Sequence, residues 1–143
     1  MYCLDANVWI YFLDAELEEH TAVHDAVAAV LEHEPLFTTT VLQMEVVHYL
    51  TNQLADSEEP VDTFLSIEDT TVAALRPDDV ERAGTLLADY PHSGIGGRDA
   101  TVLATMERHD VSRLWTHDEA LLRLGDRLDW LDVTDPVTAS AEP

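Results

Sequence analysis

The sequence predicts an α/β protein of one domain, in which a parallel sheet of four or five strands is flanked by helices on both faces. Short apolar stretches typical of buried strands alternate along the chain with longer stretches whose apolar residues recur at helical spacing. Strands that alternate with helices pair in parallel, and a parallel sheet needs cover on both faces. The chain has 143 residues, of which 46% are hydrophobic, and this is enough for a single core.

The first half of the chain opens with a short buried strand and then alternates helix and strand. The stretch MYCLD is apolar up to Asp5, and Val8 and Phe12 then follow at helical spacing. Thr39 or Thr40 has the side chain to cap the helix that follows the second strand. We expect strands over 1–5 and 35–39, and helices over 7–14, 19–33, 41–54 and 61–67.

The second half of the chain repeats this alternation of strand and helix, with clear signals for a helix start and for a loop. Pro77 begins a helix with Asp78 and Asp79 in its first turn, where a fixed φ and negative charge are both favourable. Residues 90–97 contain one proline and three glycines, which predicts a loop. We expect strands over 70–75, 112–116 and 130–133, helices over 77–89, 99–109 and 118–124, a domain over 1–135 and a short flexible tail over 136–143.

The charge of the chain excludes binding driven by a basic patch. There are 29 acidic residues against 7 basic ones, all of them arginine, and the formal net charge is −22. Such a surface repels nucleic acid and anionic lipid at ordinary salt concentrations. The acids are spread along the chain, which favours adaptation to concentrated salt over a cationic partner. We interpret the composition as that of a halophilic archaeal protein.

Two further features predict a cytoplasmic protein. Cys3 is the single cysteine, so no internal disulfide can form and a reducing compartment is expected. No stretch approaches about 18 consecutive apolar residues, and the first residues lack the basic start of a signal peptide. We therefore expect no association with a membrane.

Four acidic residues stand in surroundings unlike those of the other acids. Asp5 and Asp118 each follow an expected strand, and Asp99 begins an apolar helix directly after the glycine-rich loop. Glu45 is the sole charged residue between Glu34 and Asp56. The carboxyl ends of parallel strands meet at one edge of a sheet, which is where such folds bind ligands.

These four carboxylates predict a metal site. Carboxylates gathered at one edge repel one another, and a buried one is costly unless it is paired. A hard divalent cation such as Mg²⁺ or Mn²⁺, which prefers carboxylate and water oxygens, removes that repulsion. Each acid also has a structural alternative: Asp5 and Asp118 as helix caps, Asp99 as an acid favoured by a helix N-terminus, and Glu45 as the partner of His48 or an arginine.

Four segments each contain one of these acids: LDANVWIYFL, TTTVLQMEVVHYL, GGRDATVLATMERHD and LWTHDEALL. Together they resemble the PIN domain family, and most of all the VapC-type toxins of VapBC toxin–antitoxin pairs. PIN domains carry an Asp after the first strand, a Glu in the helix after the second, an Asp opening a later helix and an Asp after the fourth strand. The matching residues, in order, are Asp5, Glu45, Asp99 and Asp118. The resemblance covers residues 1–133 and implies a single PIN-like domain.

The resemblance implies a metal-dependent endoribonuclease that hydrolyses RNA phosphodiester bonds as the toxin of a type II toxin–antitoxin pair. Mg²⁺ or Mn²⁺ would be the cofactor, with Asp5 and Asp99 as direct ligands and Glu45 and Asp118 as ligands directly or through water. Asn7, Thr116 and Thr40 match polar positions of the family and would orient these carboxylates.

The expected partners follow from the same resemblance. They are an RNA substrate, a VapB-like antitoxin and a second copy of the chain in a homodimer. Arg98, beside Asp99, is the residue expected to contact RNA phosphate. Two alternatives to the toxin stay open, a PIN-fold binding module without catalysis and a nuclease of ribosomal RNA maturation.

Overall fold

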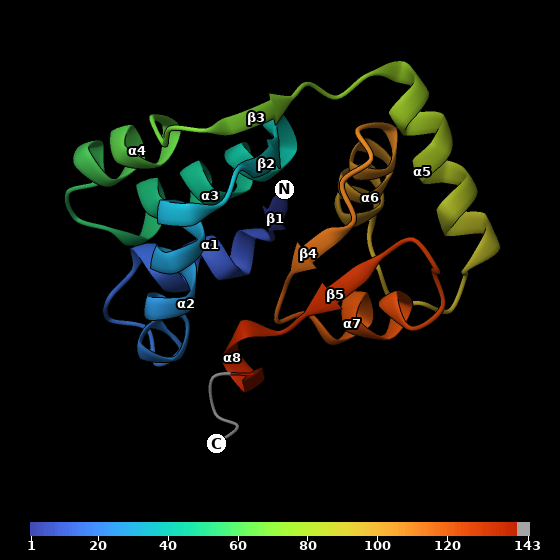
Figure 1. The fold of residues 1–143 in the computed structure, drawn as a ribbon. Coiled ribbons are helices and arrows are strands. Elements are labelled where there is room, and N and C mark those ends of the chain that lie inside the picture. The colour runs from blue at the N-terminus through green and yellow to red at the C-terminus, as the bar shows by residue number, and fades with distance from the viewer. Residues whose placement is uncertain (140–143) are drawn as a thin grey trace.

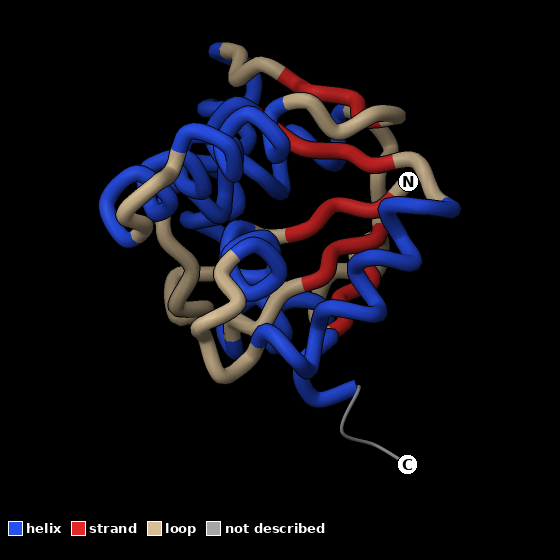
Figure 2. The backbone as a smooth tube through the Cα atoms, turned by 90° about the vertical axis from the view of Figure 1, so that its left-hand side faces the viewer, coloured by secondary structure: helices blue, strands red, loops and turns tan. Residues whose placement is uncertain are grey.

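The structure is a computed structural model that describes residues 1–139. Its centre is a sheet of five parallel strands in the order β3-β2-β1-β4-β5, which lie side by side in Figure 2. The strands are β1 (Tyr2–Leu4), β2 (Leu36–Thr39), β3 (Thr70–Ala73), β4 (Arg113–Trp115) and β5 (Asp132–Thr134). The predicted parallel sheet of four to five strands is therefore confirmed.

Helices flank the sheet, as the sequence predicts. Figure 1 shows α1 to α4 gathered on one side and α5 to α7 on the other. The helices are α1 (Ala6–Leu13), α2 (His20–His33), α3 (Thr40–Gln53), α4 (Glu58–Leu65), α5 (Pro77–Asp89), α6 (Gly97–Arg108), α7 (Glu119–Gly125) and α8 (Pro136–Ala139). Among the described residues, no helix is both long enough and apolar enough to cross a membrane.

The first strand of the chain is the central strand of the sheet. Tyr2 of β1 is in register with Leu36 of β2 on one side and with Arg113 of β4 on the other. Cys3 and Leu4 are fully buried, and Cys3 is a free thiol in the core. Because β1 is central, the residue that follows it lies in the middle of the carboxyl edge.

Side-chain caps fix the junctions where strands give way to helices. Asp5 accepts a hydrogen bond from the backbone N–H of Ala6 at 2.8 Å and caps α1. Thr39, rather than Thr40, caps α3 by accepting from the N–H of Leu42 at 3.1 Å. Such caps satisfy backbone N–H groups that the first helical turn leaves unpaired, so helices start immediately after the strands.

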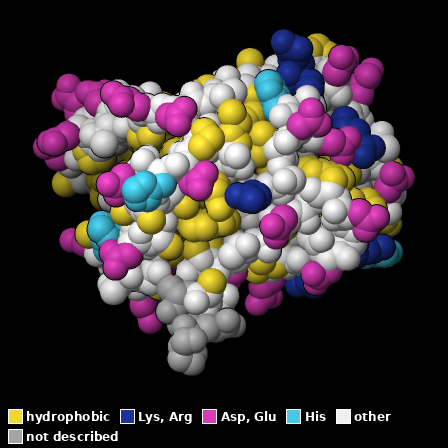
Figure 3. All heavy atoms as spheres, viewed as in Figure 1, with side chains coloured by type: hydrophobic (Ala, Val, Ile, Leu, Met, Phe, Trp, Pro, Cys, Tyr) yellow, Lys and Arg dark blue, Asp and Glu magenta, His cyan; other side chains and the backbone are white. Residues whose placement is uncertain are grey.

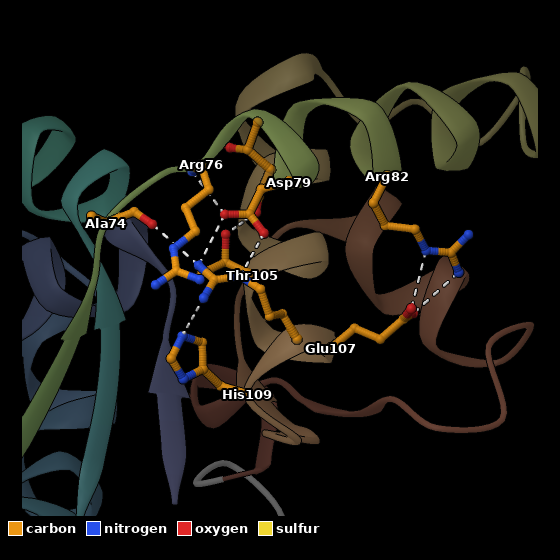
Figure 4. Close-up of polar contacts among 9 residues, drawn as sticks. Ala74, Arg76, Asp79, Arg82, Thr105, Glu107 and His109 are labelled. Carbon is orange, nitrogen blue, oxygen red and sulfur yellow. Dashed lines mark hydrogen bonds and ion pairs between the residues drawn. The ribbon is translucent and has the colours of Figure 1, made fainter.

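Two arginine–carboxylate pairs join α5 to α6 (Figure 4). Arg108 donates through Nε to Oδ1 of Asp79 at 2.8 Å and through Nη2 to Oδ2 at 3.0 Å. Asp79 is 2% exposed and also accepts from the backbone N–H of Arg76 at 2.9 Å. The second pair, Arg82 with Glu107 at 3.0 Å, is exposed to solvent. The buried pair of Asp79 and Arg108 is called the α5–α6 clamp below.

Some element boundaries differ from those predicted. The helix expected over 61–67 begins at Glu58, where two acids in the first turn are favoured by the helix dipole. The helix expected from residue 99 begins at Gly97, so the glycine-rich loop is shorter than predicted. Residues 136–139 of the expected tail form α8, which packs against α2. The rest of that tail, 140–143, lies outside the described residues.

Candidate active site

The four acidic residues come together at the carboxyl edge of the sheet. Asp5 follows β1, Asp118 begins α7 after β4, Asp99 stands in the first turn of α6, and Glu45 lies on α3. Burial, followed by the charges of Asp5, Asp118 and Glu45, raises the pKa of Asp99 to about 6. These carboxylates therefore act on one another electrostatically, as groups in a shared pocket do.

Asp5 is the most deeply placed of the four. Its side chain is 7% exposed and accepts a hydrogen bond from the Thr116 hydroxyl at 2.7 Å. Burial and the charge of Asp118 raise the pKa of Asp5, while the bonds from Thr116 and Ala6 lower it. Two donors thus hold this buried carboxylate in place, and no side chain within residues 1–139 forms an ion pair with it.

Thr116 and Asn7 form a polar frame around Asp5 and Asp118. Thr116 is fully buried, donates to Asp5 and accepts from the backbone N–H of Asp118 at 3.0 Å. Asn7 Nδ2 lies 3.5 Å from the Thr116 hydroxyl, and Asn7 Oδ1 accepts from the N–H of His117 at 3.3 Å. One hydroxyl therefore joins the Asp5 carboxylate, after β1, to the backbone of Asp118, after β4.

Glu45 and Arg98 form an ion pair at the mouth of the site. Arg98 Nε lies 3.0 Å from Glu45 Oε1, and the side chains are 75% and 21% exposed respectively. Burial raises the pKa of Glu45, whereas Arg98 lowers it and Asp5 raises it. Thr40 lines an adjoining open pocket of about 420 Å³ together with Glu45 and Arg98.

The structural alternatives considered for these acids are also realised. Asp5 caps α1, Asp118 caps α7 by accepting from the N–H groups of Ala120 and Leu121, and Glu45 pairs with Arg98. Within residues 1–139, no three His, Cys, Asp or Glu side chains are arranged to hold a metal ion.

The chemistry of the donors nevertheless fits a hard divalent cation. Four carboxylates raise the local negative charge, and burial raises the pKa of Asp5, Glu45 and Asp99. Within residues 1–139, Arg98 is the one cation that lowers any of these pKa values, that of Glu45. Carboxylate oxygens in such a set are the ligands that Mg²⁺ and Mn²⁺ prefer.

A His–Asp pair beside the site was not predicted from the sequence. His117 Nδ1 lies 2.9 Å from Oδ2 of Asp135, and the Tyr11 ring meets the His117 ring edge-on at 5.9 Å. Burial raises the pKa of Tyr11, and so do the charges of Glu19, Asp135 and Asp5. The sequence feature that could have indicated this pair is the position of Asp135, which directly follows β5 as Asp5 follows β1.

Comparison with protein families matches residues 2–127 to the PIN domain. A search of curated proteins finds no match. The fold is similar to those of several solved structures of low sequence identity.

One of these structures is Mycobacterium tuberculosis VapC20, described as a Sarcin-Ricin loop cleaving toxin, with a TM-score of 0.72 and 16% identity over 87% of this chain and 95% of that one. A second is VapBC2 of Rickettsia felis bound to a promoter DNA fragment, with a TM-score of 0.68 and 14% identity over 94% and 97%. A third is a toxin–antitoxin complex from Klebsiella pneumoniae, with a TM-score of 0.65 and 20% identity over 95% and 98%.

Proposed function

This chain belongs to the PIN domain family, and on that premise we propose that it is a metal-dependent endoribonuclease, the toxin of a type II toxin–antitoxin pair. The observation that carries the proposal is the meeting of four carboxylates at one sheet edge, where burial and the charges of the other three raise the pKa of Asp99 to about 6. The named activity of VapC20 and the VapBC and toxin–antitoxin complexes among the structures of similar fold support the toxin assignment.

In this proposal the carboxylates hold Mg²⁺ or Mn²⁺, which lowers the pKa of a bound water and neutralises charge on the phosphoryl oxygens. Asp5 and Asp99 are direct ligands, and Glu45 and Asp118 are ligands directly or through water. Thr116 fixes the orientation of Asp5, and Asn7 supports Thr116. Glu45, whose side chain is 21% exposed at the mouth of the site, orients the attacking water.

Arg98 has two partners in this proposal. Its guanidinium pairs with Glu45, yet the side chain is largely exposed and is free to turn outward. When RNA is present, the guanidinium contacts phosphate, for which its planar donors are suited. Arg98 then acts as an internal counter-charge without RNA and as a substrate contact with it.

The protein partners are an antitoxin of the VapB kind and a second copy of this chain. The acidic pocket favours a cationic antitoxin segment. For the second copy, an open apolar groove of about 490 Å³ runs between α3, α5 and α6, lined by Val41, Leu75, Val80 and Leu87 among others. Val80 is 54% exposed and Leu75 40% exposed, so burial of this groove would favour association.

The direct test is cleavage of a mixed RNA pool in molar KCl with Mg²⁺ or Mn²⁺. Asp5→Asn and Asp99→Asn are each expected to lower the cleavage rate by at least about 100-fold, since each removes a ligand charge. Asp56→Asn, which changes an exposed acid in the loop before α4, is the matched control and should cut like the wild type.

The outcomes separate the candidate functions. Metal-dependent cutting that both site variants lose supports the nuclease. If the folded wild type binds metal in a calorimetric titration but cuts no RNA with either ion, the chain is a PIN-fold binding module. Cutting confined to ribosomal RNA precursors favours the maturation nuclease over the toxin.

A further inference from the structure

The charge of this chain limits how it can hold an RNA. Phosphate contacts depend on cations, and the chain has 7 arginines, no lysine and a net charge of −22. Salt that screens the self-repulsion of the protein weakens phosphate contacts as well. Stacking of bases on aromatic rings and guanidinium planes is the contact that tolerates high salt best, because it does not depend on net charge.

One face of the sheet offers such a surface. Tyr2, Arg113, Trp115, Asp132 and Thr134 line a shallow hollow of about 330 Å³, and we call this surface the sheet platform. All five residues belong to β1, β4 and β5, so no helix contributes to its lining. Figure 3 shows hydrophobic side chains at the surface over this central part of the sheet, beside a basic group.

The sheet platform is built from flat π-systems. The rings of Tyr2 and Trp115 meet edge-on, with centroids 5.5 Å apart and an interplanar angle of 78°. The Arg113 guanidinium lies 5.1 Å from the centre of the Tyr2 ring and donates to its hydroxyl at 3.2 Å. Within residues 1–139, Arg113 is exposed and forms no ion pair, although the chain is rich in acids.

The sheet platform is continuous with the acidic site. The carbonyl of Trp115 accepts from the backbone N–H of Asp5 at 2.9 Å, and the next residue, Thr116, holds the Asp5 carboxylate. A strand of RNA that leaves the acidic edge along β4 would meet Trp115 first and Arg113 next. Asp132 stands in register with Arg113 and repels phosphate there, which favours contact through bases instead of the backbone.

We propose that the sheet platform binds unpaired bases of the RNA next to the cleavage site, by stacking on Trp115 and on the Arg113 guanidinium. The inference rests on the proposed function, since it gives the RNA of that function a second point of attachment. Aromatic and guanidinium planes are the surfaces on which proteins stack the splayed bases of single-stranded RNA. The ligand class is therefore single-stranded RNA, bound with little dependence on salt.

The test measures binding in EDTA, so that cleavage does not interfere. A labelled single-stranded RNA is titrated with the full chain at 0.5 and 2 M KCl, and fluorescence anisotropy and tryptophan emission are recorded. We expect Arg113→Gln and Trp115→Leu to weaken binding about 10-fold or more at both salt concentrations. The wild type should lose tryptophan emission on binding, and Trp115→Leu should not.

The chain contains a matched control. Arg127 lies 4.9 Å from the centre of the Tyr90 ring, so Arg127→Gln removes the same charge from the same kind of pair outside the sheet platform. It should bind like the wild type. Arg113 is exposed, so Arg113→Gln keeps the fold and remains informative if Trp115→Leu unfolds.

Four results would overturn the proposal. Equal weakening by Arg127→Gln would show an effect of net charge. A steep loss of wild-type affinity between 0.5 and 2 M KCl would show that phosphate contacts beyond the one expected of Arg98 hold the RNA. If Arg113→Gln binds RNA normally but loses a protein partner, the sheet platform is a protein interface. If the wild type cleaves RNA and both platform variants bind RNA like the wild type, only this inference is refuted. If the wild type neither binds nor cleaves RNA, the proposed function is refuted.

Discussion

At the scale of single residues, Asp99 carries much of the electrostatic strain of the site. Its pKa is raised from 3.8 to about 6, by burial first and by three neighbouring carboxylates next. A carboxyl whose pKa is raised in the folded state binds its proton more tightly there than in the unfolded chain. Folding stability is therefore highest when the group is protonated, and it falls as pH rises from about 4 to about 6.

This sign gives a prediction for Asp99→Asn. In EDTA, the variant should be more stable than the wild type above pH 6, because it lacks the repelled carboxylate, and the advantage should vanish near pH 4. Thermal unfolding of both proteins across pH 4–8 measures the difference, and the subtraction cancels titration of the other acids. If stability changes with pH equally steeply in both proteins, the neighbouring carboxylates do not affect the titration of Asp99.

Thr116 shows how much one side chain can organise. Its hydroxyl donates to Asp5 and accepts from the N–H of Asp118, so it links two predicted ligands that lie far apart in the sequence. A valine has the same shape but lacks both bonds. Burial raises the pKa of Asp5, and the bond from this hydroxyl opposes that rise.

At the scale of elements, the α5–α6 clamp should matter for stability. Arg108→Met leaves Asp79 buried without its main partner, and loss of one partner of a buried pair costs roughly 3–5 kcal/mol. The Arg108 guanidinium holds the pKa of Asp79 below its usual value, so the pair is ionised at neutral pH.

The exposed pair provides the comparison for this prediction. Arg82→Met removes a solvent-exposed partner of Glu107 on the same two helices and should cost at most about 1 kcal/mol. Urea unfolding of both variants measures the two values. Equal losses would mean that the clamp adds nothing beyond a surface contact.

Local patterns were enough to predict most elements. Asp5 as a possible cap, Thr39 as one of two possible caps, and Pro77 with its following acids all lie where the chain turns from strand to helix. Such signals act within a few residues, so they can be recognised in a single sequence. Asp5, Asp99 and Asp118 were found in the same way, from their positions at the ends of strands or the starts of helices. Glu45 was found from its isolation among uncharged residues.

What could not be predicted depends on contacts between distant segments. The clamp joins residues 29 positions apart, and the bond from Thr116 to Asp5 spans 111 positions. The sequence supplied Glu45 and Arg98 as separate candidates, but their ion pair exists because α3 and α6 lie together in the fold. The His117–Asp135 pair was missed for the same reason.

At the scale of the whole molecule, the net charge of −22 predicts that salt stabilises the fold. The screening length falls from about 10 Å at 0.1 M to about 3 Å at 1 M, and repulsion among exposed acids fades accordingly. The melting temperature should rise steadily with KCl.

A variant with fewer exposed acids isolates this effect. Asp56, Asp62 and Asp129 are exposed, and their joint replacement by asparagine should raise stability at 0.1 M KCl and flatten the salt dependence. Differential scanning calorimetry of both proteins from 0.1 to 2 M KCl measures the melting temperatures and their dependence on salt. A wild type whose melting temperature is independent of KCl would contradict the interpretation of the composition as salt adaptation.

The central position of β1 has a consequence for synthesis on the ribosome. Asp5 and its strand β1 are translated more than one hundred residues before the partner strand β4 and the hydroxyl donor Thr116. The growing polypeptide therefore contains Asp5 long before the rest of the candidate active site has been made. If the folded chain is a toxin, the cell that makes it is protected until β4 and Thr116 have been translated, and a partner made alongside it has that interval in which to engage the nascent protein.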